Sequence, residues 1–148
     1  MADEVPTTQE FYTRDLVLRL NLTIPGDVTA IGPVVDKVMW VLAEIQVAVD
    51  KEFEIETALR ESLANAVVHG CKQDPTKTVQ FFVAADKARG VMIVVRDPGS
   101  GFDPEHLPNP VVGECLYSEH GRGIFLINRL MDDVKFSKGG TEIRMRKG

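Results

Sequence analysis

The stretch "RESLANAVVHG", residues 60–70, sets the interpretation of the whole chain. Read as an α-helix, it carries Glu61, Asn65 and His69 at intervals of four residues, so the three side chains share one face. Apolar residues occupy the opposite face. Asparagine is a mediocre helix former because its amide competes for nearby backbone groups. An asparagine outside the end turns of a helix therefore indicates that its side chain has another task.

The composition is that of a single compact domain. With 148 residues, of which 44% are hydrophobic, the chain can bury one substantial core. Its net charge of -5, with lysine and arginine scattered, argues against a nucleic-acid-binding surface. Residues 1–15 are polar and are expected to form a flexible lead, and no apolar run reaches membrane-spanning length. We therefore expect a cytoplasmic protein with neither nucleic acid nor a membrane as partner.

The two cysteines, Cys71 and Cys115, form neither a C-x-x-C pair nor a disulfide framework. Incidental free thiols are the simpler interpretation. A zinc site that combines them with His69 and His120 is the alternative, but these spacings match no standard zinc finger or ribbon.

Hydrophobic periodicity predicts the elements of one domain over residues 16–148. Strands are expected where apolar and polar residues alternate or β-branched residues dominate, at 16–24, 78–86, 91–97, 133–138 and 141–147. Helices are expected where apolar residues recur at helical spacing, at 31–49, 54–69 and 122–134. Gly70 is predicted to close the second helix as a left-handed cap. This order predicts an α+β fold, a two-layer α/β sandwich with a mixed, mostly antiparallel sheet and helices on one face.

One segment, from Asp97 to Gly123, has no regular period and is rich in glycine, proline and acidic residues. A long irregular segment inside a small domain is usually a functional loop or lid. We expect a lid over about residues 102–120.

Two glycine-containing motifs flank this lid: "DPGSG", residues 97–101, at a strand end, and "GRG", residues 121–123, opening a helix. Either motif alone is more often a plain turn. Together with Glu61 and Asn65 they indicate a nucleotide site, and it is not a P-loop because no G-x-x-x-x-G-K-[ST] occurs.

The motif residues have physical reasons to contact a nucleotide. A carboxylate only accepts hydrogen bonds, so Asp97 suits the amino group of adenine, while Gly99 and Gly101 let the backbone approach the ring. Backbone N–H groups at residues 121–123 suit phosphate oxygens because the positive end of a helix dipole lies there. Arg122 can add a charge-assisted bond to a phosphate.

The helix of the opening stretch completes this site. The amide oxygen of Asn65 can join phosphate oxygens and waters around Mg²⁺. Glu61, one turn earlier, is placed to orient or deprotonate an attacking hydroxyl, although a solvated carboxylate is the ordinary interpretation of a single glutamate. His69 either contacts phosphate or simply ends the helix.

Four stretches resemble the GHKL (Bergerat) ATP-binding fold: "ESLANAVVHG", "DPGSGFDPE", "GRGIFLINRLMDDV" and "GGTEIRM". They are similar to its N, G1 and G2 boxes and its final strand. Within that superfamily they most resemble the bacterial anti-sigma-factor serine/threonine protein kinases. The resemblance runs from about Leu16 to the C-terminus, with the motifs in the family's order.

The resemblance implies an ATP site in which Glu61 is the catalytic base, Asn65 the Mg²⁺ ligand and Asp97 the adenine-reading carboxylate. Thr141 matches the threonine that supports adenine recognition beside that aspartate. The remaining nucleotide-binding positions within the motifs are His69, Gly99, Gly101, Phe102, Gly121, Arg122, Gly123 and Ile124.

The resemblance also implies partners. Such kinases hold a sigma factor inactive, phosphorylate a serine on an anti-anti-sigma protein of the STAS type, and commonly form homodimers. The expected function is therefore that of an anti-sigma factor with serine kinase activity in a partner-switching system.

One departure from the family pattern leaves an alternative open. Many members carry an arginine two or three residues before the glycine that opens the last box, where this chain has Ser118 and Glu119; Arg122 or Lys72 could substitute. The alternative function is a nucleotide-gated protein-binding module with weak or no kinase activity. A histidine-kinase catalytic fragment is a poorer interpretation, because none of His69, His106 and His120 lies on a helix that precedes the ATP site.

Overall fold

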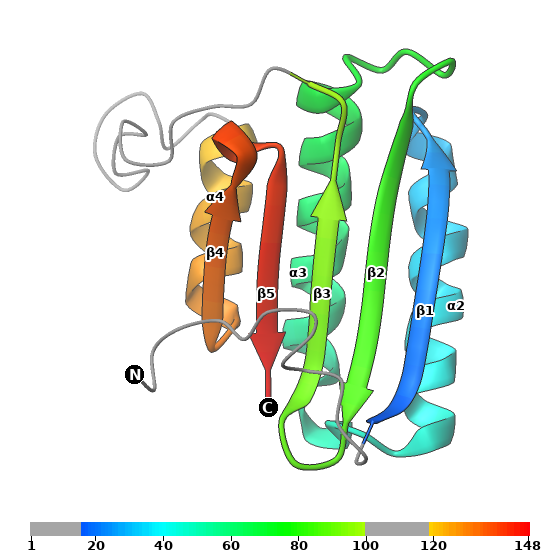
Figure 1. Ribbon diagram of the computed structural model, residues 1–148, viewed down its shortest axis with the longest axis vertical. Helices are drawn as coiled ribbons and strands as arrows, with labels where there is room; N and C mark the ends of the chain where they lie inside the picture. Colours follow the sequence, from blue (N-terminus) through cyan, green and yellow to red (C-terminus); the bar gives the residue numbers. More distant parts are fainter. Residues whose placement is uncertain (1–15, 100–118) are drawn as a thin grey trace.

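The computed structural model describes residues 16–99 and 119–148, whose strands form one five-stranded sheet (Figure 1). The order across the sheet is β1-β2-β3-β5-β4, and each neighbouring pair is antiparallel. The predicted α+β class is confirmed, with a sheet that is antiparallel at every described pair. The strands are β1 Leu16–Pro25, β2 Thr78–Asp86, β3 Gly90–Arg96, β4 Asp133–Ser137 and β5 Glu142–Lys147.

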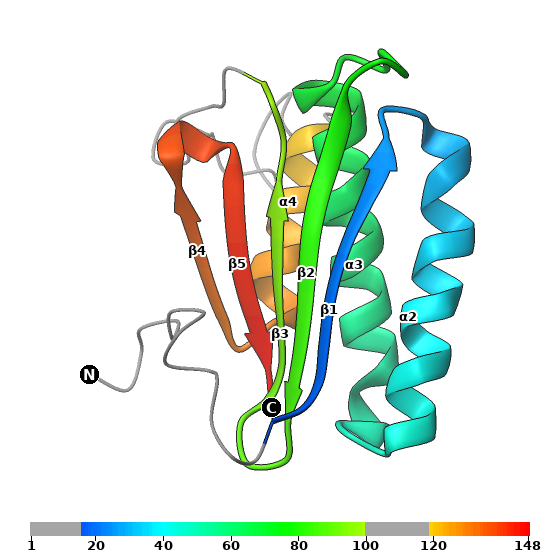
Figure 2. The same ribbon diagram turned by 45° about the vertical axis from the view of Figure 1, so that its right-hand side comes forward.

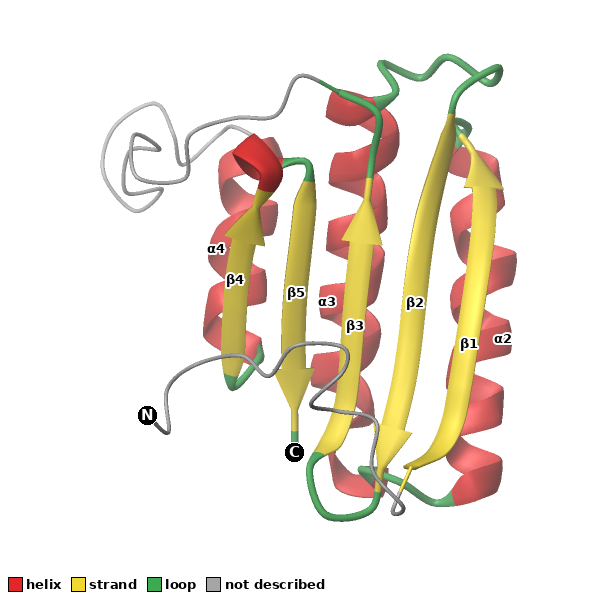
Figure 3. Cartoon of the chain, in the orientation of Figure 1, coloured by secondary structure: helices red, strands yellow, loops and turns green. Residues whose placement is uncertain are grey.

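The α-helices of the described ranges all cover one face of this sheet (Figures 2 and 3). They are α2 Ile31–Ile45, α3 Glu52–Asn65 and α4 Glu119–Leu130. Helix α2 lies behind β1 and β2, α3 behind β3, and α4 behind β4 and β5 (Figure 1). The result is the two-layer arrangement that the order of elements predicts. Among the described residues, no helix is both long and apolar enough to cross a bilayer.

The core lies between the two layers and follows the alternation of the strands. Val91, Ile93 and Val95 of β3 point toward the helices and are at most 2% exposed. The opposite face of β3 also carries apolar side chains, because Met92 and Val94 pack with neighbours from β2 in a separate small cluster. Strand β3 is therefore buried on both faces. It fixes the position of Asp97, the residue that follows it.

The observed helices differ from the predicted ones at their ends. Helix α2 ends at Ile45 because Gln46 adopts a left-handed conformation (φ 56°), so Val49 falls in a separate 3-10 turn. Helix α4 begins at Glu119, ahead of the predicted start, so Gly121 lies inside its first turn rather than before the helix. Capping conformations of this kind depend on backbone packing, which apolar spacing does not encode.

Helix α3 continues into a π turn, Ala66–Gly70, in which the Cys71 N–H donates to the Ala66 carbonyl at 2.8 Å. The prediction that Gly70 is a left-handed cap is wrong. Positive φ angles occur instead at Lys72 (53°) and Gln73 (56°), after the turn has ended. Gly70 lies in this turn and makes a close contact with Asp97.

Elements that are far apart in sequence converge at one end of the molecule, the upper end in Figure 1. The end of α3, the end of β3, the start of α4 and the β4–β5 connection all lie there. These are the elements that carry the candidate residues of the sequence motifs.

Candidate functional site

An apolar cavity of about 260 Å³ opens at this end of the molecule. Part of its wall is a row of register partners, Val95 of β3, Ile143 of β5 and Phe136 of β4, on the sheet face that carries the helices. Helix α4 supplies Ile124 and Ile127. We call this the apolar cavity; its lining residues are Ser62, Asn65, Ala66, His69, Gly70, Val95, Asp97, Ile124, Ile127, Phe136, Gly140, Thr141 and Ile143.

Asp97 places a carboxylate in the wall of the apolar cavity. Its backbone N–H donates to the Thr141 carbonyl at 2.9 Å, and its Oδ1 accepts the Gly99 N–H at 2.8 Å. Burial raises the pKa of Asp97, and the hydrogen bond from Gly99 opposes this only in part. The Asp97 side chain is thus a half-buried hydrogen-bond acceptor. The bond from Gly99 offsets only part of the cost of burying its ionised form.

Thr141 supports Asp97 through its backbone. Its hydroxyl donates to the Lys138 carbonyl at 2.8 Å, inside the short turn that joins β4 and β5. The same turn places Gly140 at the cavity wall. The position of Asp97 therefore depends on the geometry of the β4–β5 connection.

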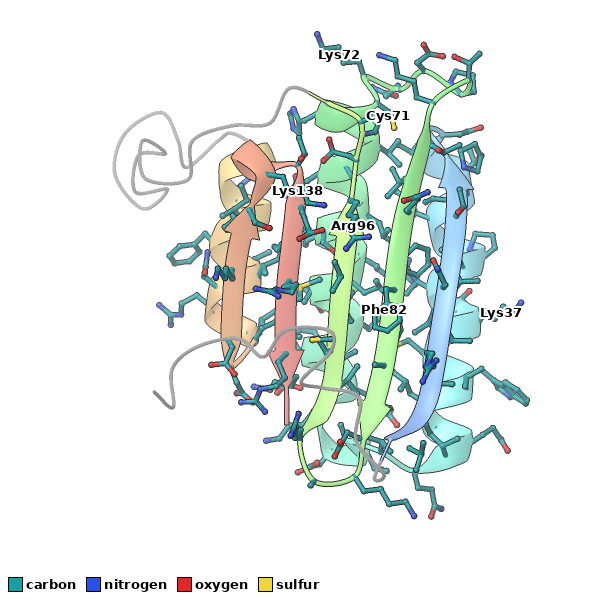
Figure 4. All side chains as sticks on the ribbon, in the orientation of Figure 1. Lys37, Cys71, Lys72, Phe82, Arg96 and Lys138 are labelled. Carbon is teal, nitrogen blue, oxygen red and sulfur yellow. The ribbon has the colours of Figure 1, made fainter. Side chains whose placement is uncertain are left out.

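A charged cluster on the open face of the sheet ties the same strands together behind the cavity (Figure 4). The nearly buried carboxylate of Glu142 accepts hydrogen bonds from Arg96 Nε and from the Ser137 hydroxyl, and it lies 3.7 Å from Lys138 Nζ. Burial alone would raise the pKa of Glu142, but the bonds from Arg96 and Ser137 hold it below its ordinary value. This cluster joins β3, β5 and β4 at the level where Asp97 leaves the sheet.

A second cavity, of about 420 Å³, lies between α3 and α4. We call it the polar cavity; its lining residues are Glu61, Ala64, Asn65, Val68, His69, Arg122, Gly123 and Leu126. Asn65 and His69 line both cavities, so they stand where the two meet.

Helix α4 packs closely on the polar side chains of α3. A Cβ atom at Gly123 would lie 2.8 Å from Glu61 Oε2 and 3.2 Å from Asn65 Nδ2. Any larger residue would displace one of these two groups. The "GRG" motif thus contributes a close contact as well as helix-end N–H groups.

The structure brings most of the predicted residues together and leaves others out. Glu61, Asn65, His69, Arg122 and Gly123 gather in the polar cavity, and Asp97, Thr141 and Ile124 line the apolar one. Lys72, proposed as a substitute cation, lines neither cavity, and its side chain points away from the body of the molecule (Figure 4). The lead 1–15, Gly101, Phe102, Ser118 and residues 102–118 of the predicted lid lie outside the described residues. The last two residues of the lid predicted over 102–120 belong instead to α4.

The alternative zinc site gains no support. Cys71 is buried, and its pKa is raised by that burial and by the nearby charge of Asp97. Within residues 16–99 and 119–148, no three histidine, cysteine or acidic side chains are arranged to hold a metal ion. Cys115 lies outside these ranges.

The sequence motifs did not identify most of the apolar wall. Phe136, Ile143 and Val95 are the clearest omissions, and they lie on three different strands. Alternation places each of them on a buried face, but only the register of the sheet makes them neighbours.

The arrangement suits a ligand with two unlike ends. The apolar cavity fits a flat, weakly polar ring that offers a donor to Asp97. The polar cavity offers Arg122 and the N-terminal turn of α4 to an anionic group, and the amide oxygen of Asn65 to a cation bound by that group. Glu61 lies beside that anionic group as a hydrogen-bond acceptor.

Comparison with known families identifies the class of this fold. The profile of the "Histidine kinase-like ATPase domain" matches residues 24–147. Since this is more than half of the chain, the chain belongs to that family.

Curated relatives are similar over most of their length. The chain is 30% identical over 111 residues to the "Anti-sigma F factor" of Heyndrickxia coagulans, covering 72% of this chain and 76% of the relative. It is 29% identical over 111 residues to the protein of the same name from Bacillus subtilis, covering 72% and 75%. It is 27% identical over 135 residues to the "Serine-protein kinase RsbW" of Halalkalibacterium halodurans, covering 86% and 82%.

A solved structure confirms the fold. The RsbU and RsbW domains of a Mycobacterium tuberculosis protein superpose with a TM-score of 0.57 at 19% identity, over 87% of this chain and 31% of that one. The chain thus corresponds to about a third of that longer protein, and the similarity concerns the fold alone.

Proposed function

We propose that this chain is a Mg-ATP-dependent protein-serine kinase that also holds a sigma factor inactive. The observation that carries the proposal is the joining of the two cavities at Asn65, with Glu61 and Arg122 on one side of it and Asp97 on the other. The names of the relatives, anti-sigma F factor and serine-protein kinase RsbW, support the same activity.

The apolar cavity would hold adenine. Val95, Ile143 and Phe136 supply an apolar surface for the ring, and Asp97 accepts the amino proton that distinguishes adenine from guanine. Because Oδ1 of Asp97 already accepts the Gly99 N–H, Oδ2 is the atom that we assign to the base.

Mg²⁺ fits the donor set at the junction of the cavities. The metal takes oxygen ligands in octahedral geometry and keeps several waters, so a single amide oxygen from Asn65 with phosphate oxygens is sufficient. When bound, Mg²⁺ would neutralise charge on the phosphates.

Glu61 would act on the substrate serine. The serine oxygen attacks the γ-phosphorus, the bond to the bridging oxygen breaks, ADP leaves, and Glu61 takes the hydroxyl proton. Arg122 lies in the same cavity and would stabilise charge on the transferred group.

The partners that we propose are a sigma factor and an anti-anti-sigma protein of the STAS type, the second being the serine substrate. A homodimer in the cytoplasm completes this proposal. Among the described strands, β1 and β4 are the outermost of the sheet, and they are the strands that we assign to self-association.

A second candidate function is a nucleotide-gated protein-binding module with little kinase activity. The observation that favours it is that Glu119, at the start of α4, stands at one of the two positions where many members of the family carry an arginine. Arg122 would then be the substitute cation, in an exposed position. Transfer of labelled γ-phosphate to the anti-anti-sigma protein of the same organism separates the two candidates.

The experiment that tests the site is calorimetric titration of ATP, with and without Mg²⁺, into the wild type and Asn65→Ala. We expect Mg²⁺ to strengthen ATP binding to the wild type and to lose most of that effect in Asn65→Ala. Asn128→Ala is the matched control, because Asn128 lies on α4, bonds the Ile124 carbonyl and lines neither cavity. A wild type that binds no ATP would overturn both candidate functions.

A further inference from the structure

Gly70 lies directly against the carboxylate of Asp97. A Cβ atom at Gly70 would lie 2.3 Å from Asp97 Cγ, 2.4 Å from Oδ1 and 2.6 Å from Cβ. Real Cβ atoms essentially never approach another heavy atom below 3.0 Å. Any side chain at residue 70 must therefore displace either this carboxylate or the end of the helix.

Asp97 is constrained on its other sides as well. Its backbone N–H is bonded to Thr141, and its Oδ1 is bonded to the N–H of Gly99. Gly99 in turn packs on Gly70, since a Cβ at Gly99 would lie 2.8 Å from Gly70 Cα and 2.9 Å from Gly70 O. Gly70, Asp97 and Gly99 thus pack against one another, and this packing restricts where the Asp97 carboxylate can lie.

The π turn is what brings Gly70 to this place. The Cys71 N–H reaches back five residues to the Ala66 carbonyl, so the turn is one residue wider than an α-helical turn. Val67 and Cys71 are fully buried and anchor the turn in the core. The helix end therefore cannot move away from Asp97 without disrupting buried packing.

We propose that Gly70 is a positioning residue that sets the Asp97 carboxylate for the 6-amino group of the base. It determines how strongly the site prefers adenine over a purine that lacks this group. This inference rests on the proposed nucleotide site and adds to it a residue that acts only through Asp97.

The test compares two probes, ATP and purine riboside 5′-triphosphate, which has hydrogen in place of the 6-amino group. The wild type should bind ATP about tenfold or more tightly than the analogue, because a hydrogen bond to a charged acceptor is lost. In Gly70→Ala we expect this ratio to fall to within about threefold, mainly through weaker ATP binding, because the displaced carboxylate no longer meets the amino group. A general defect of the fold would weaken both ligands equally.

Gly32→Ala is the matched control. Gly32 lies in α2, and a Cβ built there meets nothing within 4 Å. It should keep the wild-type ratio. A ratio in Gly70→Ala equal to that of the wild type would overturn the inference while leaving the nucleotide site intact. A wild type that binds neither probe would overturn the proposed function and this inference with it.

A double substitution keeps the test decisive if Gly70→Ala folds poorly. Asp97→Gly removes the three atoms, Cγ, Oδ1 and Cβ, that the new methyl group would meet. Urea unfolding should then show a large drop in midpoint for Gly70→Ala in the wild-type background and a much smaller drop in the Asp97→Gly background. Equal drops in both backgrounds would show that the clash is with something other than Asp97 and would overturn the inference.

Discussion

The apolar cavity is walled by the core of the protein, whereas the polar cavity is walled by the exposed sides of two helices. Ile127 and Val95, which face the apolar cavity, are 0% and 2% exposed. In the polar cavity, His69 and Arg122 are exposed, and Leu126 is 38% exposed. Val95 and Ile127 therefore serve folding and binding together, while the exposed Arg122 and Leu126 can change with little cost to the core.

The two cavities also differ in how their polar groups are held. Asp97 is fixed by the hydrogen bond from its backbone N–H to the Thr141 carbonyl, by the bond that its Oδ1 accepts from the Gly99 N–H, and by the close contact with Gly70. Glu61 and Asn65 are fixed mainly by the packing of α4 against them at Gly123. In the proposed site, recognition of the base would thus depend on the sheet, whereas the chemistry of the phosphate would depend on the packing of α4 against α3. Substitutions in the two cavities should therefore affect different measured quantities.

The largest effect should come from Glu61→Gln in the polar cavity. Glutamine keeps the shape of the side chain but cannot accept the serine proton, and general-base catalysis contributes about 10²- to 10⁴-fold to rate. We expect phosphate transfer from ATP to the anti-anti-sigma protein to slow by this factor while the Kd for ATP changes little. Single-turnover transfer of labelled phosphate, together with calorimetry of ATP, measures the two quantities separately.

Glu44→Gln provides the control for this substitution, because Glu44 is an exposed carboxylate on α2 that lines neither cavity. It should transfer phosphate at the wild-type rate. If Glu61→Gln also transferred at that rate, Glu61 would be only a solvated carboxylate, and its proposed role as the base would be wrong.

Asp97→Asn in the apolar cavity should give the next largest effect, and on binding rather than on rate. The amide would turn its oxygen toward the Gly99 N–H and its NH₂ toward the base, so two donors would face each other. Losing a hydrogen bond to a charged acceptor costs about 1.5–3 kcal/mol, or about 10- to 150-fold in the Kd for ATP. Calorimetry of ATP measures this loss.

The fold should tolerate Asp97→Asn, since burial already favours the neutral form of this side chain. Urea unfolding should show a midpoint at or above that of the wild type. Asp50→Asn, on an exposed carboxylate remote from the site, should leave both the ATP affinity and the midpoint unchanged. Unaltered ATP binding by Asp97→Asn would mean that the base lies elsewhere.

The sequence was sufficient for the elements whose residues repeat with a clear period. Alternation predicted β1, the dominance of β-branched and other strand-forming residues predicted β2 and β3, and helical spacing predicted α2, α3 and α4. The face shared by Glu61 and Asn65 is also correct, because it needs only the geometry of one helix. These features depend only on residues that are close together in the sequence, so sequence patterns are enough to predict them.

The π turn and the apolar wall could not be predicted in this way. The residues after Asn65, "AVVHG", continue an apolar pattern that suits an α-helix equally well, and the contact of the wider turn with Asp97 joins segments that are distant in sequence. Phe136 and Ile143 become part of the site only through the pairing of β4 with β5 and of β5 with β3. Both features depend on contacts between segments that are distant in sequence.

The smallest expected effect is a dependence of ATP binding on pH that arises from Asp97 alone. Because burial raises the pKa of Asp97, this carboxylate becomes protonated at a higher pH than an ordinary aspartate. The protonated form cannot accept the base's amino proton through the same oxygen, so ATP affinity should fall as pH falls through the raised pKa. Below it, the loss should reach at most about tenfold per pH unit.

The sign for folding is opposite. A carboxyl group whose pKa is raised in the folded state contributes stability that is present at low pH and is lost as pH rises through the folded pKa. ATP, which selects the ionised form, should therefore stabilise the protein less below the raised pKa than well above it, as shown by a smaller rise in Tm on adding ATP. The adenine and phosphate groups of ATP titrate as well, so the Asp97→Asn variant, which cannot titrate at this position, gives the baseline. A wild type whose affinity follows that baseline in parallel would mean that the charge of Asp97 does not contribute to recognising the base.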